Sequence, residues 1–341
     1  MVATSITVVI VWLFWPSVSQ HQVTETKATI EKPMIKAEPS QVIAVKSSSN
    51  VAVTSSRITS NDSATLVAKA YAGELNFPPY SQPLSSNDFD RLNPNYFNPQ
   101  SIPVDDDGTV VTAELSKYRY TYPESIVATL SGIDIERAQL QLIDISNGKT
   151  LLTKSFEQDD NTWQTQLAGE RDFPQQLQAT VKADINGKRV NIALSLKYID
   201  SVATLESFDS AVTHEADMLI QANLKTREKG LYRVRANLLD ENQDPIAHLV
   251  SKKKLSKGNT SIDLKAHQSV LQGKQQPFYL STFSIELMSP APGKPTKYGD
   301  SVINQYEIKD FAISGLSDLP YQPTTQEQQR LLLLQNMAQG N

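Results

Sequence analysis

The sequence predicts an all-β protein with two antiparallel β-sandwiches in tandem, over residues 109–199 and 200–316. Polar and apolar residues alternate in short segments throughout both regions, as expected for strands with one buried face. Turn-forming residues separate these segments at intervals of about 8–12 residues, a spacing typical of sandwiches. The clearest single observation is an Asn-Gly pair between two alternating segments, because Asn-Gly favours the tight turn of a β-hairpin.

This pair, Asn186-Gly187, also fixes the register of the hairpin. A two-residue turn there pairs apolar residues of the two segments as follows: Ala183 with Val190, Val181 with Ile192, Ala179 with Leu194, and Leu177 with Leu196. All of them then fall on one face, so the hydrophobic pattern and the turn agree on the register.

The rest of residues 109–199 supports about seven short strands. Asn147-Gly148 predicts a second hairpin, and further alternating segments precede and follow it. Trp163 is the only tryptophan of this region, and we interpret it as a core residue rather than as a platform for a ligand.

Residues 200–316 contain about seven more alternating segments, with a turn at Asp240–Pro245. Lys252–Lys254, together with Lys257, form a small basic cluster on one of them. The simpler interpretation is a charged edge strand, which protects a sheet from aggregation. The alternative is contact with an anionic lipid or a surface polysaccharide.

Residues 1–19 are interpreted as a signal anchor or a signal peptide. Ile6–Trp15 is strongly apolar, within an apolar stretch of about 18 residues from Met1 to Val18. This length fits both a membrane-spanning helix of about 20 residues and a signal peptide, whose core needs only about 7–15. No Lys or Arg precedes it, which departs from the usual signal peptide. A buried helix is the third interpretation. We favour the anchor because a long tether follows.

That tether is residues 20–73, which we predict to be a disordered linker. Ser, Thr, Val, Ala and Lys dominate the segment, and Tyr71 is its only aromatic residue. A chain of this kind buries too little apolar surface to offset the entropy lost on ordering.

Residues 74–108 are rich in proline and aromatic residues. From Asn76 to Pro103 there are six prolines and five aromatic residues, and the candidate interaction residues are Phe77, Tyr80, Phe89, Tyr96 and Phe97. Exposed aromatic side chains are a liability in a monomer. We therefore expect a strap that lies across a sandwich and inserts its aromatic residues, with one helical turn capped by Ser86 or Asn87. The alternative is a binding motif for another protein.

Residues 317–341 are predicted to be a tail with a C-terminal helix. Thr324 or Thr325 would cap the helix, and the expected apolar face comprises Leu331, Leu332, Leu334 and Met337. We expect this face to dock on the same chain, with a partner as the alternative.

Several chemistries lack support in the sequence. The net charge of −5 argues against nucleic acid as the main partner, and the absence of cysteine excludes thiolate sites and cysteine nucleophiles. No zinc-protease, nucleophile-elbow or nucleotide-binding motif is present. The four histidines are widely spaced, and Asp105–Thr109 fits a turn better than a calcium loop. We predict no catalytic residues, no metal and no cofactor.

Three stretches of the sequence also carry a resemblance. "GLYRVRANLLDENQDPIAHL", the closing "YEIKDFAI" and the preceding "NFPPYSQPLSSNDFDRLNPNYFNP" resemble the tandem immunoglobulin-like modules of uncharacterised gammaproteobacterial envelope proteins, over residues 74–316. The resemblance implies an exported chain with two immunoglobulin-like sandwiches, and it brings no catalytic residue with it.

The hypothesis that follows is a non-catalytic structural or protein-interaction module of the bacterial cell envelope. It would be attached to the inner membrane by its N-terminal helix, with its sandwiches in the periplasm and an envelope protein as partner; secretion after signal cleavage is the alternative. A second hypothesis is a carbohydrate- or peptidoglycan-binding module that uses an aromatic platform, with Tyr232, Tyr279 and Tyr298 as candidates. The third is a hydrolase with a site that spacing does not reveal.

Overall fold

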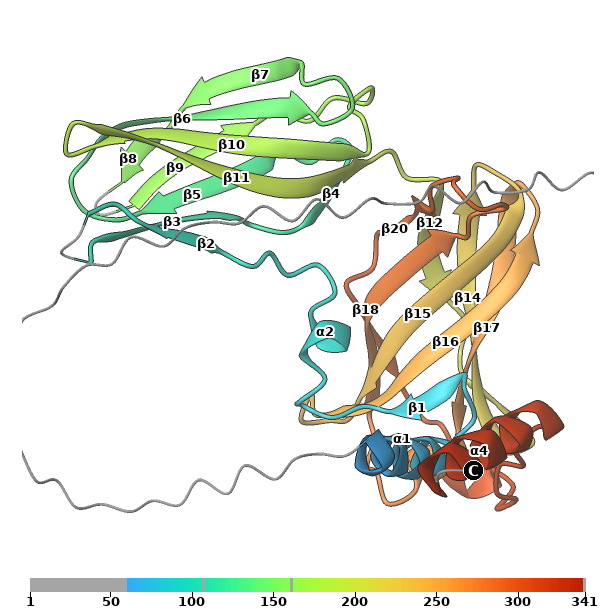
Figure 1. The fold of residues 1–341 in the computed structure, drawn as a ribbon. Helices are drawn as coiled ribbons and strands as arrows, with labels where there is room; N and C mark the ends of the chain where they lie inside the picture. The colour runs from blue at the N-terminus through green and yellow to red at the C-terminus, as the bar shows by residue number, and fades with distance from the viewer. Residues whose placement is uncertain (1–59, 106–107, 160–161, 340–341) are drawn as a thin grey trace, which may run out of the picture. The chain divides into compact units, whose positions relative to one another are not determined.

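The computed structural model describes residues 60–105, 108–159 and 162–339. The signal anchor or signal peptide predicted for residues 1–19, and the linker as far as residue 59, lie outside this part of the chain. Within the described residues, no helix is long and apolar enough to cross a membrane. Strands dominate, in four sheets whose pairing is almost entirely antiparallel (Figure 1).

The first sandwich contains two five-stranded sheets. Sheet 1 is formed, in spatial order, by β2 (Gln100–Pro103), β3 (Val110–Leu115), β5 (Ile126–Ser131), β9 (Thr162–Leu167) and β8 (Glu157–Asp159). Sheet 2 is formed by β4 (Arg119–Thr121), β11 (Lys188–Ile199), β10 (Gln176–Ile185), β6 (Ile135–Asp144) and β7 (Thr150–Ser155). One apolar core, with members from both sheets, fills the space between them.

The β10–β11 hairpin confirms the register predicted from Asn186-Gly187. Ala183 lies opposite Val190 and Leu177 opposite Leu196, with the intervening pairs as expected. Asn186 and Gly187 have φ angles of 50° and 70°, which is the left-handed geometry of the tight hairpin turn. β6 and β7 form the second predicted hairpin, through a longer loop over residues 145–149.

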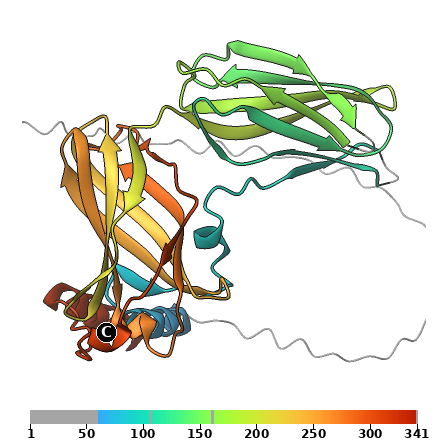
Figure 2. The ribbon, with the colours of Figure 1, turned by 180° about the vertical axis from the view of Figure 1, so that it is seen from behind.

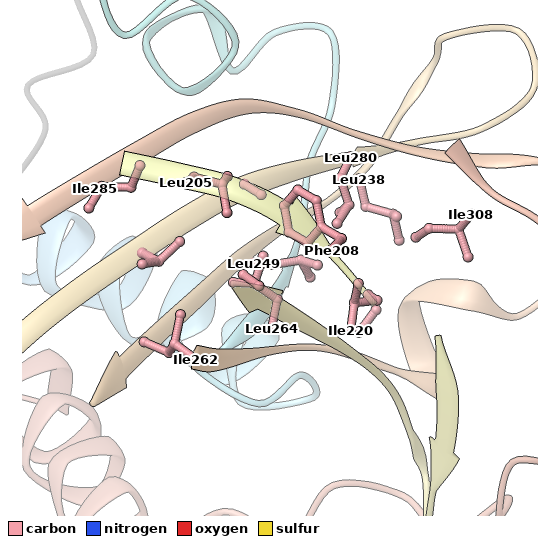
Figure 3. Packing of buried hydrophobic residues seen from close by; sticks show 14 of the residues in the cluster. Leu205, Phe208, Ile220, Leu238, Leu249, Ile262, Leu264, Leu280, Ile285 and Ile308 are labelled. Carbon is pink, nitrogen blue, oxygen red and sulfur yellow. The ribbon is translucent and has the colours of Figure 1, made fainter. Parts of the chain in front are cut away.

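The second sandwich also combines two sheets. Sheet 3 contains β13 (Val212–His214), β14 (Asp217–Thr226), β12 (Ala203–Phe208) and β20 (Asp300–Ser301), with β17 (Gly258–His267) on the other edge of β14. Sheet 4 contains β1 (Ser81–Pro83), β16 (Pro245–Leu255), β15 (Gly230–Leu239), β18 (Phe278–Leu287) and β19 (Lys297–Tyr298), with β21 (Gln305–Ile308) also on β18. Figure 3 shows side chains of both sheets meeting in the core, among them Leu205, Ile220, Leu249 and Leu280.

Both sandwiches have an immunoglobulin-like strand order. In the first, β3, β5, β9 and β8 form one sheet, and β6, β10 and β11 form the other. In the second, β12, β14 and β17 lie opposite β15, β18 and β21. This division corresponds to the two sheets of the immunoglobulin fold.

Two helices pack against each other beside the second sandwich. They are α1 (Ser60–Glu74) and α4 (Thr325–Gln339), which lie side by side in both views (Figures 1 and 2). The prediction of a linker up to residue 73 is therefore wrong for its last residues. Ala68 is buried and Tyr71 half-buried, so packing against a helix distant in sequence offsets the ordering cost of α1.

The C-terminal helix forms where it was predicted. Thr324 and Glu327 make a reciprocal capping box, in which the Thr324 amide donates to Glu327 Oε2 at 2.7 Å and the Glu327 amide donates to Thr324 Oγ1 at 3.3 Å. Leu331 and Leu334 are half-buried. Leu332 and Met337 were expected on the same face but are exposed, because the half-buried side of the helix continues through Ala338 instead.

Short elements complete the described chain. They are the helical turns α2 (Phe89–Leu92) and α3 (Gln268–Leu271) and the 3-10 turn η1 (Ile313–Gly315).

Candidate interaction site on the strap

The strap, residues 75–103, begins as an additional strand on the edge of sheet 4. β1 pairs antiparallel with β16, with Ser81 opposite Leu249 and Pro83 opposite Ala247. Two further backbone bonds extend the pairing, from Val250 N to Tyr80 O at 2.9 Å and from Leu84 N to Ile246 O at 3.0 Å. Pro83 is tolerated because β1 is the outermost strand, where no neighbour needs its missing N–H.

Two polar side chains of the strap are anchored in the second sandwich. The Tyr80 hydroxyl donates to Asp217 Oδ1 at 2.8 Å, while Lys265 Nζ lies 3.3 Å from Asp217 Oδ2. Burial, together with the Asp217 carboxylate, raises the pKa of Tyr80. Ser81 is fully buried, and its Oγ accepts a hydrogen bond from the His267 amide at 3.1 Å. These bonds fix the position of β1.

Two aromatic residues of the strap pack in different apolar cores. Phe77 is half-buried and packs against the core of the second sandwich, whereas Phe97 is buried in the core of the first. Asn95 attaches the same end of the strap to β4, because its amide group accepts from the Arg119 N–H at 2.6 Å and donates to the Arg119 carbonyl at 2.8 Å. The strap is thus fastened at both ends.

The remaining two aromatic residues are not used in this way. Phe89 and Tyr96 contact each other edge to face, with ring centroids 5.1 Å apart and an interplanar angle of 84°. They are 49% and 54% exposed. Among the described residues, the Tyr96 hydroxyl has no hydrogen-bond partner. We call Phe89 and Tyr96 the aromatic pair.

The helical turn that carries Phe89 is held on sheet 4. Asp88 is its N-cap, so the prediction of Ser86 or Asn87 is wrong; the Asp88 carboxylate accepts from the amide and hydroxyl of Ser85, each at 2.8 Å. These bonds lower the pKa of Asp88. From β15, Asn237 Nδ2 donates to the Arg91 carbonyl at 2.7 Å.

His248 lies beneath this turn, with Nδ1 2.8 Å from Asn237 Oδ1. Burial and the nearby cations Arg91 and Arg235 lower the pKa of His248 to about 4. His248 is therefore neutral at physiological pH. It acts as part of the support for the helical turn.

The other residues considered from the sequence do not converge. Tyr232 is buried and donates its hydroxyl to the Glu228 carbonyl, which rules it out as a platform; Tyr279 and Tyr298 are half-buried. In the described part of the chain, no three His, Asp or Glu side chains are grouped as a metal site would require. Asp105 accepts from the Thr109 amide, as a turn residue does.

Lys252–Lys254 occupy the half of β16 that extends beyond β1, at an edge with which no strand of the described residues pairs.

Sequence reasoning missed the residues that receive the strap. Asp217 is separated from Tyr80 by 137 positions, and Asn237 from Arg91 by 146. No local pattern marks an acceptor whose partner is so remote, and an aspartate at a strand start is otherwise an ordinary surface residue.

Comparisons with known proteins give only weak structural likenesses. No family model matches the chain, and no curated protein matches it in sequence. A DUF4785 family protein from Legionella pneumophila is 14% identical with a TM-score of 0.41, and the match covers 52% of each chain. Native α2-macroglobulin of E. coli is 12% identical with a TM-score of 0.33, over 62% of this chain and 14% of that one. The chain thus spans about half of the Legionella protein.

Proposed function

We propose that this chain is a non-catalytic interaction module of the bacterial cell envelope, and that the aromatic pair contacts a partner protein. The observation that carries the proposal is the difference in burial and bonding among the five aromatic residues of the strap. Three are committed to the chain's own structure, whereas Phe89 and Tyr96 remain about half exposed.

The anchoring of the strap favours binding over chance exposure. Phe89 sits on a helical turn fixed by Asn237, and Tyr96 directly precedes the buried Phe97. A preorganised aromatic side chain loses little conformational entropy when it binds. Aromatic residues also supply a large share of the energetic centres of protein interfaces. Both properties suit a small, rigid contact site.

The size of the expected contribution can be estimated from exposure. An aromatic side chain buries about 150–250 Å² in an interface. About half of each ring is available here, so full burial would contribute about 2 kcal/mol per residue at ~25 cal/mol per Å². Each alanine substitution should then weaken binding by roughly 30-fold.

The envelope location is part of the proposal. It is supported by the apolar stretch Ile6–Trp15 and by the resemblance of residues 74–316 to gammaproteobacterial envelope modules. We propose that the stretch anchors the chain in the inner membrane, with the sandwiches in the periplasm. A fusion of the full chain to alkaline phosphatase should be active, because this reporter folds only after export. A reporter that stays inactive while the fusion protein accumulates would contradict the location.

The partner is tested by crosslinking in intact cells followed by capture of the tagged full chain. A defined envelope protein should be recovered with the wild type and lost with the double variant Phe89→Ala/Tyr96→Ala. Leu319→Ala is the matched control, since Leu319 is 71% exposed and lies outside the strap. Equal recovery with wild type and double variant would refute the site. Recovery of cell-wall polysaccharide by both, with no protein, would favour a carbohydrate-binding module instead.

A further inference from the structure

The outer face of sheet 2 contains a polar hollow that the proposed function does not use. Its volume is about 700 Å³, and it lies entirely within the first sandwich. Most of its lining residues come from β6, β10 and β11, and Ser155 of β7, Phe156 and Trp163 of β9 complete the lining. Since all of these belong to one packed unit, the hollow is a property of that sandwich alone.

The strand register explains how the polar groups come together. Lys182 lies opposite Asn191 on one side and Gln139 on the other, and Gln139 lies opposite Ser155 of β7. Directly opposed residues of antiparallel strands share a face. Four strands therefore present a continuous polar row, about 14 Å long for three inter-strand spacings. Gln141 belongs to the next row, opposite Thr180.

Four polar side chains of the hollow make no hydrogen bond or ion pair with the described part of the chain. Among the described residues, no hydrogen bond or ion pair involves the side chains of Gln139, Gln141, Lys182 or Asn191. Gln139 and Gln141 are nonetheless half-buried. Each carboxamide offers two donors and one acceptor oxygen in a plane. The carboxamides of Gln139 and Gln141 are therefore available to hydrogen-bond a ligand in the hollow.

Charge biases the hollow toward anions. Arg137, Lys182 and Arg189 line the hollow together with one carboxylate, that of Asp184, which gives three positive charges against one negative and a net charge of +2. Both arginines contact Asp184 through Nε, Arg189 at 3.2 Å. Their hydrogen bonds lower the pKa of Asp184, so it stays ionised and orients both guanidinium groups. The terminal nitrogens of the guanidinium groups have no partner in the described part of the chain.

Trp163 adds an apolar surface. It is half-buried, packs against the core of the first sandwich and also lines the hollow. The expectation of a core residue is therefore confirmed only in part, because Trp163 packs against the core but is not fully buried in it. Trp163 comes from β9 of sheet 1, so no local pattern predicts that it lines a hollow together with residues of sheet 2.

We propose that this hollow binds an acidic polysaccharide, with the carboxamides on sugar hydroxyls, Lys182 and the arginines on the acidic groups, and Trp163 beside a sugar ring. Polar and apolar atoms contribute about equally to the lining, so it suits a drug-sized apolar ligand less well than the mostly apolar sites that such ligands occupy. Protein interfaces need an apolar or aromatic centre, whereas most of the lining residues from β6, β10 and β11 have amide or charged side chains. The elongated row and the net positive charge fit an extended, anionic, hydroxyl-rich chain.

The test uses the full chain and four probes, and measures affinity by titration at low and at physiological salt. Polygalacturonate and dextran sulfate carry carboxylate and sulfate groups on sugars, neutral dextran has no charge, and polyglutamate has charge without sugar. One or both acidic polysaccharides should bind, more weakly as salt rises. Lys182→Ala/Asn191→Ala should weaken that binding at least tenfold. The control variant Lys149→Ala, in the exposed 145–149 loop, should stay within twofold.

Fluorescence gives a second readout. With Trp12→Phe and Trp15→Phe in the same chain, Trp163 is the only tryptophan left, and its emission should change with the bound polysaccharide. Equal thermal stability of the variants shows that the sandwich remains folded.

Three outcomes would overturn the proposal. They are no binding of either acidic polysaccharide, equal or tighter binding of polyglutamate or neutral dextran, or binding that Lys182→Ala/Asn191→Ala leaves unchanged. The result is independent of the aromatic pair, because Phe89→Ala/Tyr96→Ala leaves the hollow intact. Loss of the protein partner and loss of polysaccharide are therefore separable.

Discussion

Replacing Tyr80 by Phe removes one hydroxyl and leaves the aromatic ring in place. That hydroxyl donates to Asp217 Oδ1 at 2.8 Å, and Asp217 is only 6% exposed. Hydrogen bonds to charged groups contribute about 1.5–3 kcal/mol. Lys265 still contacts the carboxylate at 3.3 Å and Tyr80 is only half-buried, so we expect a loss of about 1.5–2 kcal/mol in strap attachment.

Hydrogen exchange measures this loss where it occurs. The Val250 amide donates to the Tyr80 carbonyl, and the His267 amide donates to Ser81 Oγ. Both should exchange about 10–30-fold faster in Tyr80→Phe, which is the same free energy expressed as a local opening equilibrium. Tyr96→Phe is the matched control, because the Tyr96 hydroxyl has no partner among the described residues and its side chain is 54% exposed.

The raised pKa of Tyr80 also predicts how the stability of strap attachment changes with pH. The folded pKa of Tyr80 is raised above its ordinary value near 10, so the neutral form is favoured in the attached strap. Its contribution is fully present below pH ~10 and is lost as the pH rises above that value. The difference between wild type and Tyr80→Phe should therefore shrink in alkali. Equal protection of Val250 and His267 in Tyr80→Phe and Tyr96→Phe would refute this account of the anchor.

Three further perturbations test other parts of the structure. Gly187→Ala forces a side chain into a φ of 70° and should destabilise the first sandwich by about 1–2 kcal/mol in urea unfolding followed by intrinsic fluorescence. Because the pKa of His248 is lowered to about 4, the contribution of this histidine to the stability of the fold is present above pH ~6.5 and is lost as the pH falls toward 4. His248→Gln should therefore reduce the loss of stability between pH 6.5 and 4 by up to about 3 kcal/mol. An unchanged loss of stability in this pH range would exclude the supporting role of His248. The side chain of Glu286 is 9% exposed, and its carboxylate contacts both Arg233 and Arg235. Glu286→Gln removes the negative charge and should lower the stability measured by thermal unfolding by about 2–3 kcal/mol. An unchanged stability would show that the two arginines do not need this carboxylate.

The parts of the fold that the sequence predicts are those determined by local pattern. The β10–β11 register follows from alternation and one Asn-Gly turn, and both lie within a short stretch. The capping box at Thr324 and Glu327 is similarly local. The prediction that the strap inserts its aromatic residues into a sandwich is confirmed for Phe77 and Phe97, which pack in the cores, and is wrong for Phe89 and Tyr96, which are exposed.

What the sequence does not reveal depends on remote partners. Helix α1 has a composition typical of a linker and is stabilised by α4, some 250 positions away. The exposure of Phe89 and Tyr96, against the burial of Phe97, depends on which sandwich each part of the strap reaches. The hollow on sheet 2 gathers residues from several strands, among them Trp163 of sheet 1, and no two of its polar groups form a recognisable motif.

The most direct test of the proposed function is photo-crosslinking from the aromatic pair in living cells. A photoreactive phenylalanine analogue replaces Phe89 in the full chain, with the same analogue at Leu319 as the control. The account predicts a discrete adduct with one envelope protein from position 89, its loss when Tyr96→Ala is added, and no such adduct from position 319. No adduct from position 89, or an equal pattern from both positions, would contradict the claim that the aromatic pair is an interaction site.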